Sequence, residues 1–164
     1  MAHIVLVGLP GVGKSTVGRA LADRWNVDFI DCDDAFVDRW GETVQEVLRR
    51  DGEAVFRVRE YEVLEEVLQR DAVVATGGGA VTTAPARALL RTVPTFWLDA
   101  PDDVLVERVR EGDRPLLGDA PAEALARLRE QRARLLADVA RGHIAVDRVI
   151  EDICYDLELA LEAN

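Results

Sequence analysis

Short apolar runs alternate with stretches of helical periodicity along the whole chain. Strands are predicted at residues 3–7, 29–31, 72–76 and 95–98, with a weaker candidate at 144–147. Stretches with apolar residues at helical spacing separate them, and clusters of glycine and proline mark the loops. Strands joined by right-handed helical crossovers form a parallel sheet that is covered on both faces. We therefore predict a three-layer α/β fold of about five strands in a single domain over residues 1–164.

Composition and charge narrow the function classes. The 164 residues are 49% hydrophobic and 31% charged, which is typical of a folded domain and not of a disordered chain. A net charge of -11 disfavours nucleic acid and anionic membranes as partners, and we expect neither. We also expect a cytoplasmic protein, because the sequence has no membrane-length apolar stretch and no signal-peptide pattern. The isolated Cys32 and Cys154 are expected to be buried free thiols.

A phosphate-binding loop is predicted at residues 8–15. GLPGVGKS fits the pattern G-x-x-x-x-G-K-[ST] and lies between a predicted strand and a predicted helix, a context that argues against a chance glycine-rich turn. Lys14 is the only lysine and Ser15 the only serine in a chain that elsewhere uses arginine for positive charge and threonine for hydroxyl groups. We infer that arginine and threonine would not have the chemistry needed at these two positions. In such loops backbone amides surround the phosphates, the lysine reaches the β- and γ-phosphates, and the hydroxyl ligates Mg²⁺.

Two carboxylates follow the second predicted strand, in the sequence DCDD at 31–34. Because side chains alternate along a strand, we expect Asp31 and Asp33 to share a face while Cys32 points away. In a phosphoryl-transfer site one carboxylate can serve the metal and the other can orient or deprotonate the attacking hydroxyl. We assign Asp31 to the metal and Asp33 to the hydroxyl. The alternative is a solvated acidic turn in which Asp34 caps a helix.

Charged residues interrupt the apolar faces of two predicted helices. In the helix at 54–68, Glu60 falls inside the apolar stripe and Arg57 lies at its edge, one turn earlier. In the helix at 122–140, Arg132 occupies a position where an apolar residue is expected. Either arginine could bind an anionic ligand. A structural Arg–Glu bridge and an arginine that reaches outward from the margin of the core are the alternatives.

Two loops complete the candidate site. Residues 109–121 are rich in glycine, proline and charge, and we expect a lid that brings Arg114 over the triphosphate; an irregular surface loop is the alternative. Gly77, Gly78 and Gly79 follow the third strand. The lack of side chains there suits the close approach of a ligand or another backbone. We interpret these glycines as a wall of the acceptor pocket.

Taken in order, these motifs resemble the shikimate kinase family from Gly8 to about Arg148. The matching pieces are GLPGVGKST at 8–16, DCD at 31–33, D-G-E-x-x-F-R-x-x-E at 51–60, GGGAV at 77–81, RPLL at 114–117 and Arg132. The resemblance implies an ATP- and Mg²⁺-dependent kinase with a nucleoside-monophosphate-kinase-like fold. Such an enzyme transfers the γ-phosphate of ATP to the 3-hydroxyl of shikimate, in the pathway to chorismate and aromatic amino acids.

The resemblance also implies roles in the acceptor pocket. It makes Asp33 the contact to the shikimate hydroxyls and the base, and Arg57 and Arg132 the clamp on the carboxylate. It sets Gly78 against the ring. The expected substrate-binding residues are Asp33, Arg57, Glu60, Gly77, Gly78, Gly79 and Arg132.

For the nucleotide, the resemblance makes Lys14 and Arg114 catalytic contacts to the phosphates and Arg108 the arginine that stacks on adenine. It gives Ser15 and Asp31 to Mg²⁺. The expected nucleotide contacts are Gly11, Val12, Gly13, Lys14, Ser15, Thr16, Arg108, Arg114 and Arg148.

Two other functions stay open at this point. An inward pair of arginines suits any carboxylate, so the acceptor could be another small hydroxy acid such as gluconate. The chain could also be a non-catalytic module that binds ATP for regulation. A GTP switch is disfavoured, because no N-K-x-D base-reading motif can exist when the only lysine is in the phosphate loop. We expect a monomer that acts on a small molecule.

Overall fold

The computed structural model describes residues 1–111 and 120–163, and within them the chain forms a five-stranded sheet. Every strand pairing is parallel and the strand order is β2-β3-β1-β4-β5. The strands are β1 (Ile4–Val7), β2 (Asp28–Asp31), β3 (Ala72–Ala75), β4 (Thr95–Asp99) and β5 (Gly142–Ala145). The predicted parallel α/β fold is therefore confirmed. Arg114 and the rest of 112–119, the greater part of the expected lid, lie outside the described residues.

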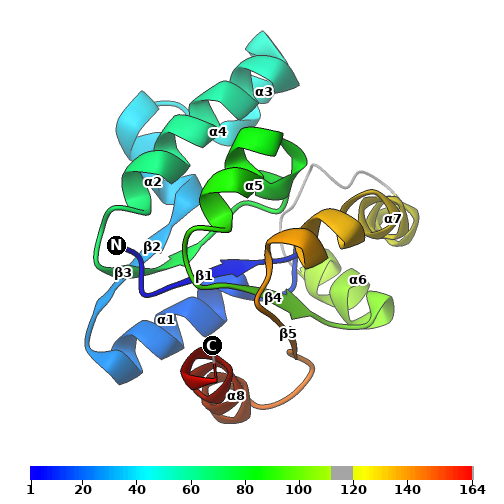
Figure 1. The fold of residues 1–164 in the computed structure, drawn as a ribbon. Helices are drawn as coiled ribbons and strands as arrows, with labels where there is room; N and C mark the ends of the chain where they lie inside the picture. The colour runs from blue at the N-terminus through cyan, green and yellow to red at the C-terminus, as the bar shows by residue number, and fades with distance from the viewer. Residues whose placement is uncertain (112–119, 164) are drawn as a thin grey trace.

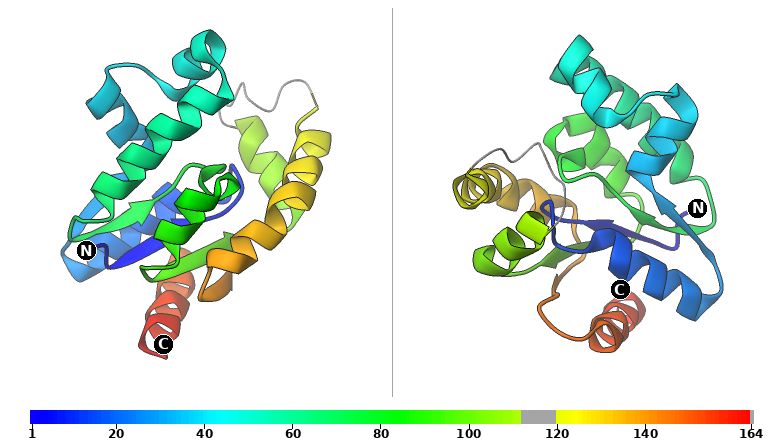
Figure 2. Two further views of the ribbon diagram at one scale, coloured as in Figure 1. Left: turned by 45° about the horizontal axis from the view of Figure 1, so that its top comes forward. Right: turned by 180° about the vertical axis from the view of Figure 1, so that it is seen from behind.

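Helices cover both faces of the sheet. They are α1 (Lys14–Trp25), α2 (Cys32–Trp40), α3 (Val44–Asp51), α4 (Glu53–Val67), the 3₁₀ turn η1 (Ala80–Thr82), α5 (Ala84–Leu90), α6 (Asp102–Glu111), α7 (Pro121–Val139) and α8 (Ile150–Glu162). Figure 1 shows α1 and α8 together on one side of the sheet, with α4 and α5 on the other. Two further views show the same layers, with α7 running beside α5 (Figure 2). No helix among the described residues is both long and apolar enough to cross a bilayer.

The central strands show why the fold can be predicted from apolar runs. β1 (IVLV) and β3 (AVVA) are buried at every position, as expected for strands with a layer on each face. β5 is an edge strand that pairs only with β4 in the described sheet, and Ile144 is its one buried residue. Its apolar signal is therefore weak, and the strand begins at Gly142, two residues before the predicted start.

Three loops meet at one edge of the sheet because of the strand order. β3 lies between β2 and β1, and all three strands run in the same direction. The residues that follow them are the phosphate loop after β1, the start of α2 after β2 and the glycines after β3. In open parallel sheets ligands bind at these carboxyl ends.

Candidate active site

The loop from Gly8 to Gly13 connects β1 to the first residue of α1. Gly11 and Gly13 have φ values of +82° and +99°, a region that glycine adopts without strain. Gly11 also lies close to α6, where a Cβ atom would be 2.8 Å from the Cγ2 atom of Val109. Gly13 is the N-cap of α1 and has no side chain to occupy the first amides of the helix. The loop thus presents a helix N-terminus that suits a phosphate.

Lys14 and Ser15 begin α1 and are both held by neighbouring groups. The buried Lys14 donates from Nζ to the carbonyl oxygens of Gly8 at 2.8 Å and Leu9 at 3.1 Å. The hydroxyl of Ser15 donates a hydrogen bond to Oδ2 of Asp31. The two residues that were predicted to serve a metal therefore lie together, with oxygen atoms that suit Mg²⁺.

A larger metal cluster is absent from the described part of the chain, since no group of three or more His, Cys, Asp or Glu side chains there could hold an ion. Protein sites for Mg²⁺ commonly use one or two carboxylates and take the remaining ligands from substrate phosphates and water. The pair of Ser15 and Asp31, beside a phosphate loop, fits that kind of site.

The prediction that Asp31 and Asp33 alternate along a strand is wrong. Helix α2 begins at Cys32, directly after β2, because Oδ1 of Asp31 accepts a hydrogen bond from the backbone N–H of Asp33 at 2.9 Å and caps the helix. Asp31, and not Asp34, is therefore the N-cap. Asp33 lies in the first turn of α2, while the side chain of Cys32 is buried in the core.

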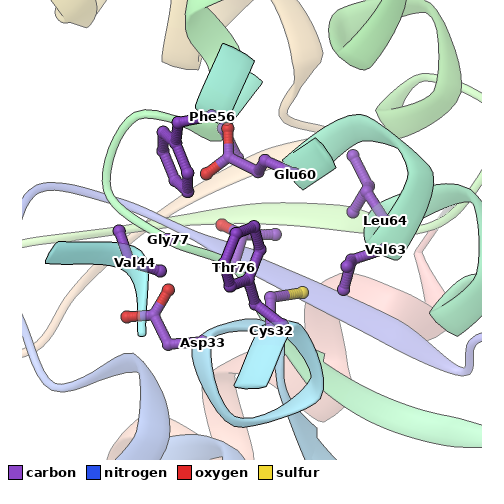
Figure 3. A pocket seen from close by; sticks show the side chains of 11 residues that line it. Cys32, Asp33, Val44, Phe56, Glu60, Val63, Leu64, Thr76 and Gly77 are labelled. Carbon is purple, nitrogen blue, oxygen red and sulfur yellow. The ribbon is translucent and has the colours of Figure 1, made fainter. Parts of the chain in front are cut away.

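Asp33 and Glu60 approach each other in a pocket between α2, α4 and the end of β3. Figure 3 shows the two carboxylates facing the same space from opposite sides. A Cβ atom on Gly77 would lie 3.3 Å from Oδ1 of Asp33 and 3.3 Å from Oε2 of Glu60, so this glycine sits beside both carboxylates. The residues that line the pocket are Cys32, Asp33, Phe36, Val44, Phe56, Glu60, Val63, Leu64, Thr76, Gly77 and Ala80.

Arg57 and Glu60 form the predicted pair on α4. Nη1 of Arg57 donates to Oε1 of Glu60 at 2.9 Å, and the two side chains are only 14% and 13% exposed. Glu53 accepts a second, longer contact from Nη2 at 3.3 Å. The guanidinium group also lies 4.9 Å from the ring centroid of Phe56. These contacts hold Arg57 in one orientation.

Arg132 reaches the same region from α7. Its Nη1 donates to the carbonyl oxygen of Gly78 at 2.9 Å. Burial, together with the nearby positive charge of Arg57, lowers the pKa of Arg132. Burial also raises the pKa of Glu60, against the opposing effect of Arg57. Two guanidinium groups thus share a partly desolvated region, where an anion between them would be stabilised.

Each glycine of the Gly77–Gly79 segment leaves room for a protein side chain. Gly77 borders the carboxylates described above, and a Cβ atom on Gly78 would lie 3.0 Å from the Cδ atom of Pro10 in the phosphate loop. On Gly79 it would lie 2.3 Å from Nη2 of Arg57. We expected the glycines to admit a ligand or another backbone. In the structure they also leave space for the side chains of Asp33, Glu60, Pro10 and Arg57.

A separate cleft of about 360 Å³ is lined by six of the expected nucleotide contacts, Gly11, Val12, Gly13, Thr16, Arg108 and Arg148. Lys14 and Ser15 are not among its lining residues, and Arg114 lies outside the described residues. Arg108 donates to the carbonyl oxygen of Val12 at 2.8 Å and to that of Val146 at 3.2 Å. It thus connects α6 to the phosphate loop and to the residue that follows β5. Arg148 lies at this cleft and forms an ion pair with Asp156 of α8. The lining residues are Gly11, Val12, Gly13, Thr16, Val17, Arg108, Val146, Arg148, Ile150 and Ile153.

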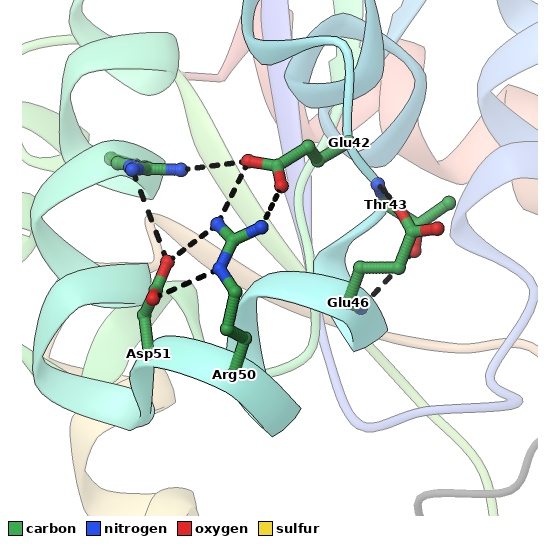
Figure 4. Close-up of polar contacts among 6 residues, drawn as sticks. Glu42, Thr43, Glu46, Arg50 and Asp51 are labelled. Atoms are coloured by element: carbon green, nitrogen blue, oxygen red, sulfur yellow. Dashed lines mark hydrogen bonds and ion pairs between the residues drawn. The ribbon is translucent and has the colours of Figure 1, made fainter.

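An ion network that the sequence analysis missed supports α4 from outside. Arg50 of α3 binds Glu42 and Asp51, and Arg59 of α4 donates to Oε2 of Glu42 at 3.2 Å (Figure 4). Hydrogen bonds to Asp51 and Glu42 raise the pKa of Arg50. The network joins α3 to the helix that carries Arg57.

Comparisons with known proteins identify relatives of this chain. The family model for shikimate kinase matches residues 10–160. Shikimate kinase from Corynebacterium efficiens is 37% identical over 94% of this chain and 96% of its own length. A bifunctional shikimate kinase/3-dehydroquinate synthase from Thermotoga maritima is 41% identical over 85% of the chain, which spans 28% of that longer protein. The structure of shikimate kinase from Acinetobacter baumannii in complex with shikimate has a TM-score of 0.90 and 36% identity, covering 98% of this chain and 93% of the other. The chain therefore belongs to the shikimate kinase family.

Proposed function

We propose that this kinase transfers the γ-phosphate of ATP to the 3-hydroxyl of shikimate, a step toward chorismate and aromatic amino acids. The observation that carries the proposal is the convergence of Asp33, Arg57 and Arg132 on one region next to the phosphate loop. A carboxylate and a set of hydroxyl groups are the chemical features that such a pocket recognises.

The acceptor is held at its two ends. Arg57 and Arg132 bind the carboxylate, and each is already oriented, by Glu60 and by the carbonyl oxygen of Gly78. Asp33 accepts the hydrogen bond of the attacking hydroxyl and takes up its proton as the phosphoryl group transfers. The lowered pKa of Arg132 supports this role, because an anion offsets the repulsion from Arg57.

The nucleotide is held by the loop before α1. The amides at the start of the helix and the ammonium group of Lys14 bind the phosphates, while the cleft beside Arg108 takes the adenosine. We propose that Arg114, which lies outside the described residues, adds positive charge at the γ-phosphate.

Ser15 and Asp31 are proposed to hold Mg²⁺. A Mg²⁺ ion held there would supply positive charge next to the phosphates, where negative charge develops during transfer. The contribution of the chain is a hydroxyl and a carboxylate fixed next to each other by the cap of α2 and the start of α1.

An acceptor panel tests the function. ATP consumption is measured with shikimate, gluconate and other hydroxy acids, and the phosphorylated product is identified by mass spectrometry. We expect kcat/KM for shikimate to exceed that for gluconate by at least about a hundredfold, because unpaired polar groups penalise the wrong acceptor. A preference for gluconate, or ATP binding without turnover of any acceptor, would contradict the proposal. The monomeric state, the cytoplasmic location and the absence of nucleic-acid and membrane partners stay predictions.

A further inference from the structure

Helix α7 has buried apolar residues near its two ends and none in its middle. Leu125, Leu136 and Val139 are its buried residues, and the first two are three helical turns apart. Between Leu125 and Leu136, the side chains of Arg129 and Arg132 form hydrogen bonds to the body of the protein. The apolar side chains of this stretch that pack against the core are only partly buried. Polar contacts therefore hold this part of the helix together with apolar side chains that are only partly buried.

Arg129 supplies most of these contacts. Its Nε donates to Oδ1 of Asp102 at 2.6 Å, and Nη1 donates to both carboxylate oxygens of Asp99, at 3.0 and 3.2 Å. Nη2 donates to the carbonyl oxygen of Ala100 at 2.8 Å. The side chain is 27% exposed, so these charge-assisted bonds are partly shielded from water. All three nitrogen atoms of one guanidinium group are bound to one short segment.

That segment connects β4 to α6. Asp99 is the last residue of β4, which lies between the central strand β1 and the edge strand β5. Asp102 is the first residue of α6. Asp99 also contacts Nε2 of His143 in β5 at 3.0 Å. Arg129 thus fastens α7 to the sheet at the junction of β4 and α6.

Arg132 lies one helical turn after Arg129 and on the same side of α7. Its guanidinium group reaches Gly78 at the acceptor pocket, whereas Arg129 binds the end of a neighbouring strand. A small rotation or shift of α7 would displace Arg132 from the acceptor carboxylate, and displacements of about 1 Å can cost about a hundredfold in rate.

We propose that Arg129 is a positioning residue for the acceptor site: it fixes the middle of α7 to the junction of β4 and α6 and so sets where Arg132 meets the acceptor carboxylate. This proposal rests on the proposed role of Arg132 in acceptor binding. It adds a specificity element that touches neither the acceptor nor the nucleotide.

The first experiment compares Arg129→Met, which keeps the length of the side chain, with Arg129→Lys and with Arg134→Met, a control on the exposed face of the same helix. We expect Arg129→Met to raise KM for shikimate about tenfold, with KM for ATP changed less than about twofold. Arg129→Lys should recover part of the loss, because an ammonium group still pairs with the carboxylates. Arg134→Met should match the wild type.

A double-mutant cycle separates positioning from general stability. If Arg129 acts through Arg132, adding Arg129→Met to Arg132→Ala leaves KM for shikimate unchanged, whereas independent effects multiply. An additive result, or a lower Tm with equal changes in both KM values, would overturn the proposal. Should Arg129→Met fail to fold, the cycle is run with Arg129→Lys.

The wild-type acceptor panel keeps this test apart from the proposed function. If the wild-type enzyme phosphorylates a different hydroxy acid and not shikimate, the proposed function is wrong. The double-mutant cycle is then measured with that acceptor instead. A coupling between Arg129 and Arg132 supports the positioning role in either case, and its absence refutes it.

Discussion

The guanidinium group of Arg57 lies so close to the backbone of Gly79 that a Cβ atom at this glycine would be 2.3 Å from Nη2 and 2.8 Å from Cζ. The φ angle of Gly79 is −105°, which other residues also adopt. The arginine, and not the backbone conformation, therefore requires a glycine here. The position of the Arg57 guanidinium group therefore depends on the absence of a side chain at Gly79.

Gly79→Ala should consequently damage acceptor binding without unfolding the protein. The guanidinium group of Arg57 has to move by at least about 1 Å to restore an ordinary contact distance. We expect kcat/KM for shikimate to fall about a hundredfold while the Kd of ATP, measured by calorimetry, stays near that of the wild type. In an Arg57→Ala background the added methyl group has no guanidinium group to displace, so a further large loss there would argue against this explanation.

Asp33→Asn tests the proposed base. The amide keeps the shape of the side chain but cannot take up a proton, and so kcat should fall about a hundred- to ten-thousandfold. Nucleotide binding should persist, because Asp33 lines the pocket with Glu60 and Gly77 and not the cleft beside Arg108. Single-turnover measurements of product formation give the chemical rate directly. Near-normal turnover would remove Asp33 from the role of base.

Arg132→Ala and Arg132→Lys separate charge from shape at the acceptor carboxylate. Alanine removes the donor to the acceptor, and we expect KM for shikimate to rise at least about tenfold with a smaller change in kcat. Lysine keeps the charge but cannot offer two parallel donors, so it should restore only part of the affinity. Arg127→Ala, an exposed arginine on the same helix, serves as the control. An unchanged KM in both Arg132 variants would refute the assignment.

The parts of the fold that could be predicted are those set by local pattern. Four consecutive buried residues mark β1 and β3, whereas β5, with Ile144 as its one buried residue, was placed two residues late. The pair of Arg57 and Glu60 follows from helix geometry alone, since residues three apart share a face.

The parts of the site that the sequence did not reveal depend on contacts between distant segments. Arg129 binds Asp99 and Asp102, which lie 30 and 27 residues earlier in the chain, and nothing in the local pattern of α7 identifies those partners. Asp33 was predicted to share a strand face with Asp31, and this prediction is wrong because Asp33 lies in a helix. The capping bond of Asp31 starts α2 at once, so helix geometry and not strand alternation directs Asp33.

Glu60 gives a prediction for the pH dependence of stability. Burial raises its pKa above that of an ordinary glutamate, so the folded protein holds this proton more tightly than the unfolded chain does. The stability that the carboxyl group contributes is fully present below its unfolded pKa of about 4.3 and is lost as the pH rises through the raised folded value. Glu60→Gln removes this titration.

Relative to Glu60→Gln, the wild-type protein should therefore lose stability as the pH increases from about 4 to neutrality. The measurement is the Tm of both proteins across this pH range. The difference between the two Tm values is compared, because the titrations of groups distant from Glu60 cancel in it. Glu60→Gln also removes the carboxylate that pairs with Arg57. This changes the Tm of the variant by an amount that does not vary with pH, so the slope of the Tm difference against pH stays the same. Glu65→Gln, on the exposed part of the same helix, should follow the wild-type curve in shape. A Tm difference that stays constant or runs in the opposite direction would show that Glu60 carries no raised pKa in the folded protein.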